Sequence, residues 1–181
     1  MIDVLKEEDK ARHLVSIVTK RSFSNGKFDS FFGVGITVRN FLSGIFDSYA
    51  HTELDFLDDW SWSASESLDR LDMNGKKAGV GFKAIEYSHP ERWVRTNIDV
   101  RDPRLKIRYK NVFELKEKCI KYTGRDYDLI GCFGQAINIK EVEDRTKFFC
   151  SEAVGYVFGF PSLSPAKLQK EIERLFKRSK T

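Results

Sequence analysis

Two segments that lie far apart in the chain carry the residue types of a nucleophile and its base. Cys150 stands where the apolar pair Phe148-Phe149 gives way to a predicted helix. A helix N-terminus presents unpaired N–H groups and positive dipole charge, and both stabilise a thiolate. His51 lies far upstream, with Glu53 two positions after it. The two segments predict nucleophilic catalysis, in which a Cys150 thiolate attacks a carbonyl carbon and His51 takes and returns the proton.

The segment 50–56 is predicted to position His51. Small or apolar residues alternate there with polar ones, which is typical of a strand with one buried face. On such a strand His51 and Glu53 share a face and lie roughly 7 Å apart along the chain. A catalytic triad needs a third group that holds the imidazole in the correct tautomer, and we expect Glu53 to supply it.

Further elements must bring these two segments together. Alternating or apolar runs predict strands at residues 14–18, 60–65, 80–87 and 93–100, while 36–42 could be a strand or a short helix. Capping and turn residues predict helices over 112–122 after Asn111, from 150 to a stop at Gly159, and from Ser164-Pro165 onward. Strands followed by helices indicate an α+β fold with a small antiparallel sheet packed against helices.

The composition fits one folded domain over residues 1–181. The hydrophobic fraction is 41% and 32% of the residues are charged, which suits a core beneath a hydrated surface. The net charge of +4 is too small to predict a nucleic-acid binder, and the basic residues between 101 and 110 are interpreted as a solvated face. No apolar run approaches the ~18–20 residues of a membrane span, and residues 1–8 are too charged for a signal peptide. We therefore expect a cytoplasmic protein.

The cysteines show no metal-binding pattern. There are three of them and no CxxC pair, and an odd number in a chain of this length does not predict a disulfide framework. Together with the three histidines they lack zinc-ligand spacing, so neither a metal nor another cofactor is predicted. Cys119 falls on the apolar stripe of the 112–122 helix and is interpreted as a core residue, whereas Cys132 is ambiguous.

Four short motifs follow one another in a particular order. They are a strand bearing His51, a turn with Tyr-Asp at 125–128, Phe-Cys-Ser-Glu at 149–152 opening a helix, and Ser164-Pro165 before a last helix. This order resembles the circularly permuted papain-like thiol hydrolases, the YiiX-like branch of the NlpC superfamily. In that branch the histidine strand precedes the cysteine helix, as it does here. The resemblance covers about residues 36–170, and within it the stretches 50–65 and 79–83 are similar to members found in bacteriophages and prophages.

The resemblance implies a permuted papain-like domain in which Cys150 is the nucleophile and His51 the base. The backbone N–H of Cys150 is then the natural first donor to an oxyanion. The family also suggests Tyr127 as a second donor or a pocket wall. Gln135 is another candidate, because papain-like enzymes often use a glutamine for this purpose.

The third catalytic residue stays open between two strands. Many members of the family carry a polar residue on the strand after the histidine strand, which corresponds here to Ser63 or Glu66. Serine orients an imidazole less well than a carboxylate does, so Glu53 is preferred and Ser63 and Glu66 are the alternatives.

Several functions are compatible with these residues. The first is a cysteine peptidase or amidase that cleaves an amide bond in cell-wall peptide or in a protein. The same fold is also implied for acyltransferases or lipid thioesterases, and it could serve as a non-catalytic virion or binding module. The expected partner is therefore a peptide or acyl substrate, and no nucleic acid is expected. A phage-encoded enzyme could be associated with the virion or released on lysis.

Overall fold

The computed structural model of the protein describes residues 4–21, 23–24, 27–28, 49–65, 79–85, 87, 90–128, 147–160 and 163–176. The strands are β1 (Leu14–Arg21), β2 (Phe23–Ser24), β3 (Lys27–Phe28), β4 (Tyr49–Asp55), β5 (Trp60–Ser65), β6 (Gly79–Ala84), β7 (Trp93–Asp99), β8 (Asp126–Tyr127) and β9 (Lys147–Phe148). The helices are α2 (Val112–Ile120), α4 (Cys150–Val157) and α5 (Pro165–Phe176), with short 3-10 turns η1 (Glu7–Lys10) and η2 (Pro90–Arg92).

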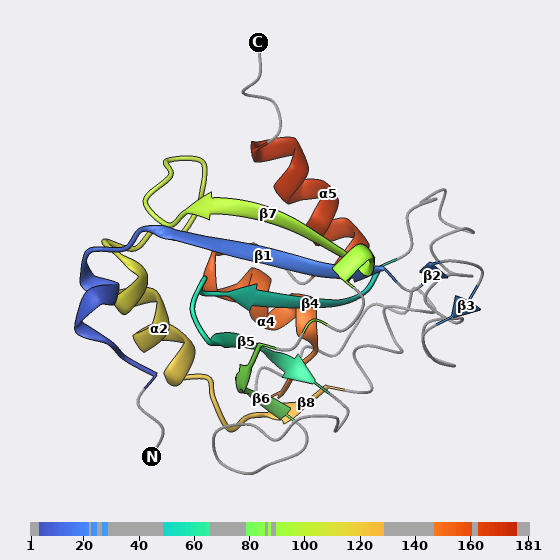
Figure 1. The fold of residues 1–181 in the computed structure, drawn as a ribbon, viewed down its shortest axis with the longest axis horizontal. Coiled ribbons are helices and arrows are strands. Elements are labelled where there is room, and N and C mark those ends of the chain that lie inside the picture. Colours follow the sequence, from blue (N-terminus) through green and yellow to red (C-terminus); the bar gives the residue numbers. More distant parts are fainter. Residues whose placement is uncertain are drawn as a thin grey trace.

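A five-stranded antiparallel sheet forms the centre of the molecule (Figure 1). The strand order is β6-β5-β4-β1-β7, so the first strand of the chain lies between β4 and β7. The predicted α+β fold with an antiparallel sheet is therefore confirmed. The position of β1 has no signal in local sequence, because it depends on which strands pair.

Helices cover one face of this sheet. Ile17 of β1 and Leu54 of β4 are cross-strand partners and belong to the same buried cluster as Val154 of α4 and Leu168 of α5. On the same face Thr19 donates a hydrogen bond to Gln169 Oε1 of α5 at 2.8 Å. In Figure 1, α4 lies behind β4. Burial of this face holds the two C-terminal helices against the strand that carries His51.

The helix ends follow the expected capping chemistry. The side chain of Asn111 accepts a hydrogen bond from Glu114 N at 3.0 Å at the start of α2. Ser164 Oγ accepts from Lys167 N at 3.4 Å before α5, whose first residue is Pro165. Gly159 follows α4 with a φ of +78°, a backbone conformation that glycine adopts without strain. The expected segment 36–42 lies outside the described residues.

A two-stranded parallel pair, β8 with β9, connects the sheet to α4. Val80 N of β6 donates to Arg125 O at 2.9 Å, just before β8. Gly79 has a φ of +106°, and a Cβ there would lie 2.6 Å from Arg125 O, so only glycine allows this close approach. Tyr127 of β8 in turn pairs with Phe148 of β9, two residues before Cys150. The chain that leads into α4 is thus fixed against β6.

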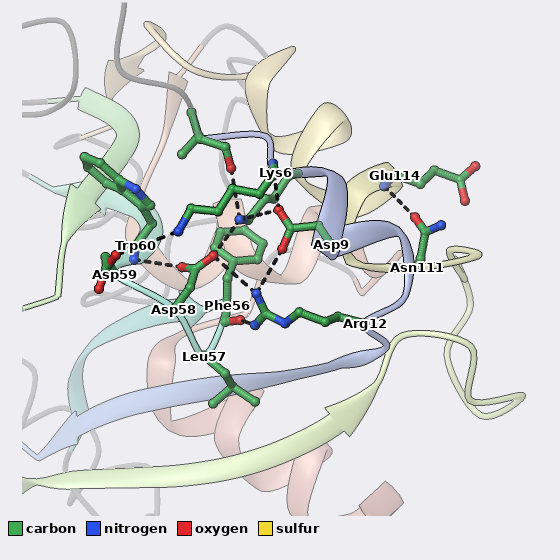
Figure 2. Close-up of polar contacts among 12 residues, drawn as sticks. Lys6, Asp9, Arg12, Phe56, Leu57, Asp58, Asp59, Trp60, Asn111 and Glu114 are labelled. Carbon is green, nitrogen blue, oxygen red and sulfur yellow. Dashed lines mark hydrogen bonds and ion pairs between the residues drawn. The ribbon is translucent and has the colours of Figure 1, made fainter.

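A buried group of charged residues joins the N-terminal segment to α2 and to the β4–β5 turn (Figure 2). We call Asp9, Arg12, Asp58 and Lys116 the lysine network. Lys116 Nζ lies 2.8 Å from Asp9 Oδ2 and 2.6 Å from Asp58 Oδ2, and it also donates to the backbone oxygen of Val4 at 2.9 Å. Arg12 contacts both aspartates, at 2.9 Å and 3.4 Å. Each buried charge in this network has at least one oppositely charged partner, as burial requires.

The β4–β5 turn contains the single non-glycine residue with positive φ among the described residues. Leu57 has a φ of 59°, and its N–H donates to Asp55 Oδ1 at 2.7 Å. Trp60 N donates to Asp58 Oδ1 at 2.8 Å. Two aspartates thus shape the turn by accepting hydrogen bonds from backbone N–H groups two residues on.

Within the part of the chain that the structure describes, no helix is long and apolar enough to span a bilayer.

Candidate active site

Cys150 is the first residue of α4. The preceding Phe149 has an extended backbone, and its carbonyl accepts the first helical hydrogen bond, from Ala153 N at 2.9 Å. The Cys150 side chain therefore lies at the end of the helix where first-turn N–H groups lack intrahelical acceptors and the helix dipole is positive. Ser151 fixes this turn by donating its hydroxyl to Leu163 O at 2.6 Å. Cys150 itself is only 3% exposed.

His51 lies near the start of β4, opposite Lys20 of β1. Its Nε2 is 3.0 Å from Oε1 of Glu53, and the Glu53 side chain is buried. The imidazole is 22% exposed, so solvent reaches part of the ring. The two residues share a face of the strand, as the alternating pattern predicted, and the structure brings their side chains into contact.

The side chains of His51 and Cys150 also meet across the site. Burial alone would lower the pKa of His51. The interaction with Cys150, through charge and a hydrogen bond to the ring, followed by the contact with Glu53, raises that pKa to about 9. Because Nε2 faces Glu53, Nδ1 is the ring nitrogen left for a further contact. The imidazole thus lies between a thiol and a carboxylate, which are the groups that a cysteine nucleophile, its base and an orienting residue would supply.

The pairing between β4 and β5 stops before it reaches His51. Its described pairs are Leu54 with Trp62 and Asp55 with Ser61. One step nearer to His51, the hydroxyl of Ser63 donates to Thr52 O at 2.6 Å. Ser63 is thus buried and bonded to backbone, and the structure does not bring it to the imidazole. Glu66, the other alternative for the third residue, lies outside the described residues.

Tyr127 lies close to Cys150 through the pairing of β8 with β9. It pairs with Phe148 in the parallel β8–β9 ladder, and its ring packs against the main hydrophobic cluster. The pairing places Tyr127 beside the segment that leads into α4, and its role as an oxyanion donor or a pocket wall stays a prediction. Gln135 lies outside the described residues, as does Cys132.

Asp55 was not among the predicted site residues. It continues the His51–Glu53 face of β4 and is 1% exposed. Its Oδ2 accepts hydrogen bonds from Arg95 at 2.6 Å and from the Tyr87 hydroxyl at 3.2 Å. The alternation of residues 51, 53 and 55 was a signal that could have identified Asp55. Tyr87 and Arg95 come from other segments and needed the strand order.

Two aromatic rings extend the same group of contacts to His51. Trp93 of β7 meets the imidazole edge-on, with ring centroids 6.4 Å apart and an interplanar angle of 82°. Tyr87 meets Trp93 at 4.9 Å and 62°. Lys20 Nζ lies over the Trp93 ring at 5.7 Å. His51 therefore has neighbours from four parts of the fold: β1, β4, β7 and α4.

The other cysteine with a described position differs from Cys150. Cys119 is fully buried in α2, and burial raises the pKa of its thiol well above the ordinary value. It therefore behaves as a core residue, as predicted. No group of three or more His, Cys, Asp or Glu side chains that could hold a metal ion occurs in the described ranges.

Two arginines of the basic segment 101–110 form local ion pairs. Arg101 lies 2.7 Å from Asp99, and Arg104 lies 2.6 Å from Asp102 and from Leu175 O. These contacts explain the positions of both arginines through the fold of the loop and the end of α5.

No family model matches the chain, and no curated protein or solved structure matches it either.

Proposed function

We propose that the protein is a cysteine hydrolase that cleaves an amide bond, with Cys150 as nucleophile, His51 as base and Glu53 as the group that orients His51. One observation supports this most directly: residues from a strand and a helix far apart in sequence meet as thiol, imidazole and carboxylate. A permuted papain-like domain is the proposed fold family, on the order of its motifs.

The reaction follows from the placement of these groups. The Cys150 thiolate attacks the carbonyl carbon, and the carbonyl π electrons move to oxygen, which the N–H groups at the start of α4 stabilise. The intermediate collapses as the C–N bond breaks, and the His51 imidazolium gives its proton to the departing amine. Neutral His51 then takes a proton from water, whose oxygen adds to the thioester. Cleavage of the C–S bond releases the acid and restores the thiolate. Transfer to an acceptor other than water would make the protein an acyltransferase.

A second candidate function is a non-catalytic binding module. The observation in its favour is the 3% exposure of Cys150, since a thiol that stays covered cannot reach a carbonyl carbon. The reactivity of the Cys150 thiol distinguishes the cysteine hydrolase from the binding module.

The first experiment measures iodoacetamide alkylation of each cysteine against pH, by peptide mapping, in wild type and His51→Ala. We expect Cys150 to react rapidly at pH 6 in wild type and to lose this reactivity in the variant. Cys119 is the internal control and should stay unreactive. If Cys150 is inert, or titrates in both proteins as a free thiol near pH 8.5, the hydrolase proposal is wrong. Alkylation that behaves as expected then justifies comparing peptidyl 4-nitroanilides with 4-nitrophenyl esters of increasing acyl length.

Glu53→Gln tests the assignment of the third residue. The amide keeps a hydrogen bond to the ring but removes the negative charge, so the pKa of His51 should fall below about 9. When the rate of Cys150 alkylation is plotted against pH, the alkaline limb of the curve should move to lower pH as the pKa of His51 falls. Ser63→Ala is the matched control, because its hydroxyl contacts backbone oxygens. A larger effect from Ser63→Ala than from Glu53→Gln would assign the role to Ser63.

A further inference from the structure

Two buried carboxylates lie side by side on the His51 face of β4. Glu53 is 2% exposed and Asp55 is 1% exposed. Like charges this close in a buried site repel each other, so each needs its own compensation. Glu53 contacts His51, whereas Asp55 is bonded by Arg95, Tyr87 and Leu57 N. The site thus divides into one carboxylate that faces the imidazole and one that holds neighbouring side chains.

The hydroxyl of Tyr87 donates a hydrogen bond to Asp55. Burial, and then the negative charges of Glu53 and Asp55, raise the pKa of its hydroxyl far above the ordinary range, and Arg95 opposes this only in part. The hydroxyl is therefore protonated at neutral pH and can donate to Asp55. The Arg95 guanidinium lies over the ring, 4.6 Å from its centroid, and restrains Tyr87 from one side.

The ring of Tyr87 connects this anchor to the catalytic imidazole. Tyr87 packs on Trp93, and Trp93 meets His51 edge-on. Aromatic pairs of this geometry contribute beyond their buried area, and they restrict the orientation of both rings. A continuous series of contacts thus runs from Asp55 through Tyr87 and Trp93 to His51.

We propose that Tyr87 is a positioning residue of this site: its hydroxyl is held by Asp55, and its ring holds Trp93 against the His51 imidazole so that Nε2 stays directed at Glu53. The role depends on the proposed function only for its effect on turnover, since the orientation of His51 is a property of the folded protein. Among the described residues, the titratable or charged groups next to His51 are Glu53 from β4, Cys150 from α4 and Lys20, its cross-strand partner in β1.

The test is the pKa of His51, measured by NMR titration in wild type, Tyr87→Phe and Tyr87→Ala. The His51 signal is assigned by its loss in His51→Ala, because the chain has two other histidines. We expect the pKa of His51 to fall from about 9 towards the ordinary 6.5 in Tyr87→Phe, and further in Tyr87→Ala. The reason is that a loosened ring admits water between the imidazole and its charged partners.

Tyr109→Phe is the matched control. Tyr109 is a buried tyrosine whose hydroxyl donates to Val157 O at the far end of α4, so this variant also loses a buried hydrogen bond. The pKa of His51 should be unchanged in it. If Tyr87→Phe and Tyr109→Phe give the same His51 pKa as wild type, the positioning role is wrong. If the wild-type pKa is itself near 6.5 and Cys150 titrates as a free thiol, the hydrolase proposal fails. If Tyr87→Ala does not fold, the His51 pKa in Tyr87→Phe alone decides whether Tyr87 positions the imidazole.

Discussion

The two ends of β4 each hold buried charges, but in opposite arrangements. The turn after β4 carries Asp58 of the lysine network, in which Lys116 Nζ donates to three oxygens and is fully buried. The start of β4 carries His51, whose ring lies between Cys150 and Glu53 and is partly exposed. One group joins three segments of the chain, and the other brings a thiol, an imidazole and a carboxylate together.

The two groups differ in what they are expected to do: the lysine network supports the fold, and the His51 site is proposed to carry out the chemistry. In the lysine network each of the two aspartates contacts both cations, Lys116 and Arg12, so its charges are paired with one another inside the fold. At the thiol site the decisive group is an imidazole whose pKa of about 9 depends on neighbours that can themselves react. A change in the first group should therefore alter stability, and a change in the second should alter pH dependence.

The largest effect is expected from Lys116→Met. This variant leaves Asp9 and Asp58 buried without their main cation, and the loss of one partner from a buried ion pair typically costs about 3–5 kcal/mol. The free energy of unfolding, measured by urea denaturation, should fall by that amount. Lys121→Met, at the exposed end of the same helix, is the control and should change it little. Alkylation of Cys150 in the folded fraction should keep its wild-type pH profile. If Lys116→Met were as stable as Lys121→Met, the lysine network would not have the stabilising role that the comparison assigns to it.

A smaller effect, and one that depends on pH, is expected at His51. Its pKa is raised from 6.5 to about 9 on folding, so protonated His51 stabilises the folded state fully below pH 6.5. This contribution disappears as the pH rises through about 9. At about 1.4 kcal/mol for each pH unit, it amounts to about 3 kcal/mol. The difference in unfolding free energy between wild type and His51→Gln should shrink by this amount from pH 6 to pH 10. A constant difference would show that folding leaves the pKa of His51 at its ordinary value of 6.5.

The smallest effect is expected at the turn that separates the two groups. Leu57 has positive φ and an exposed side chain, and an L-residue in this region costs about 1 kcal/mol relative to glycine. Leu57→Gly should therefore raise the free energy of unfolding by about 0.5–1 kcal/mol. Leu14→Gly provides the control, since Leu14 is equally exposed but lies in β1, where glycine should destabilise. If both substitutions changed the free energy of unfolding in the same direction, the backbone at Leu57 would not be strained.

Local patterns predicted the elements that carry the site. Alternation identified β4 and the shared face of His51 and Glu53. Asn111 and Ser164-Pro165 marked the starts of α2 and α5, and these caps form as expected. Such features depend on neighbours within a few residues, so they are legible in one sequence.

Contacts between distant strands were not predictable in the same way. The insertion of β1 between β4 and β7 places Lys20 beside both His51 and Trp93. Nothing in the sequence around these residues specifies that register, because it depends on the total burial that alternative pairings achieve. The same holds for Lys116, which reads as a surface lysine on α2 and is fully buried. The roles of Cys150, His51 and Tyr127 in a reaction remain predictions.

The central position of β1 has a consequence for synthesis of the chain. A ribosome releases β1 early, yet both of its neighbours follow later, and the second of them ends only at Asp99. Both edges of β1 are open until β4 emerges, and one edge stays open until β7 follows; open strand edges are where nascent chains recruit chaperones or associate with one another. Cys150 emerges later still. The growing polypeptide can thus complete its five-stranded sheet before Cys150 leaves the exit tunnel, and the thiol meets the His51 imidazole after the sheet has formed.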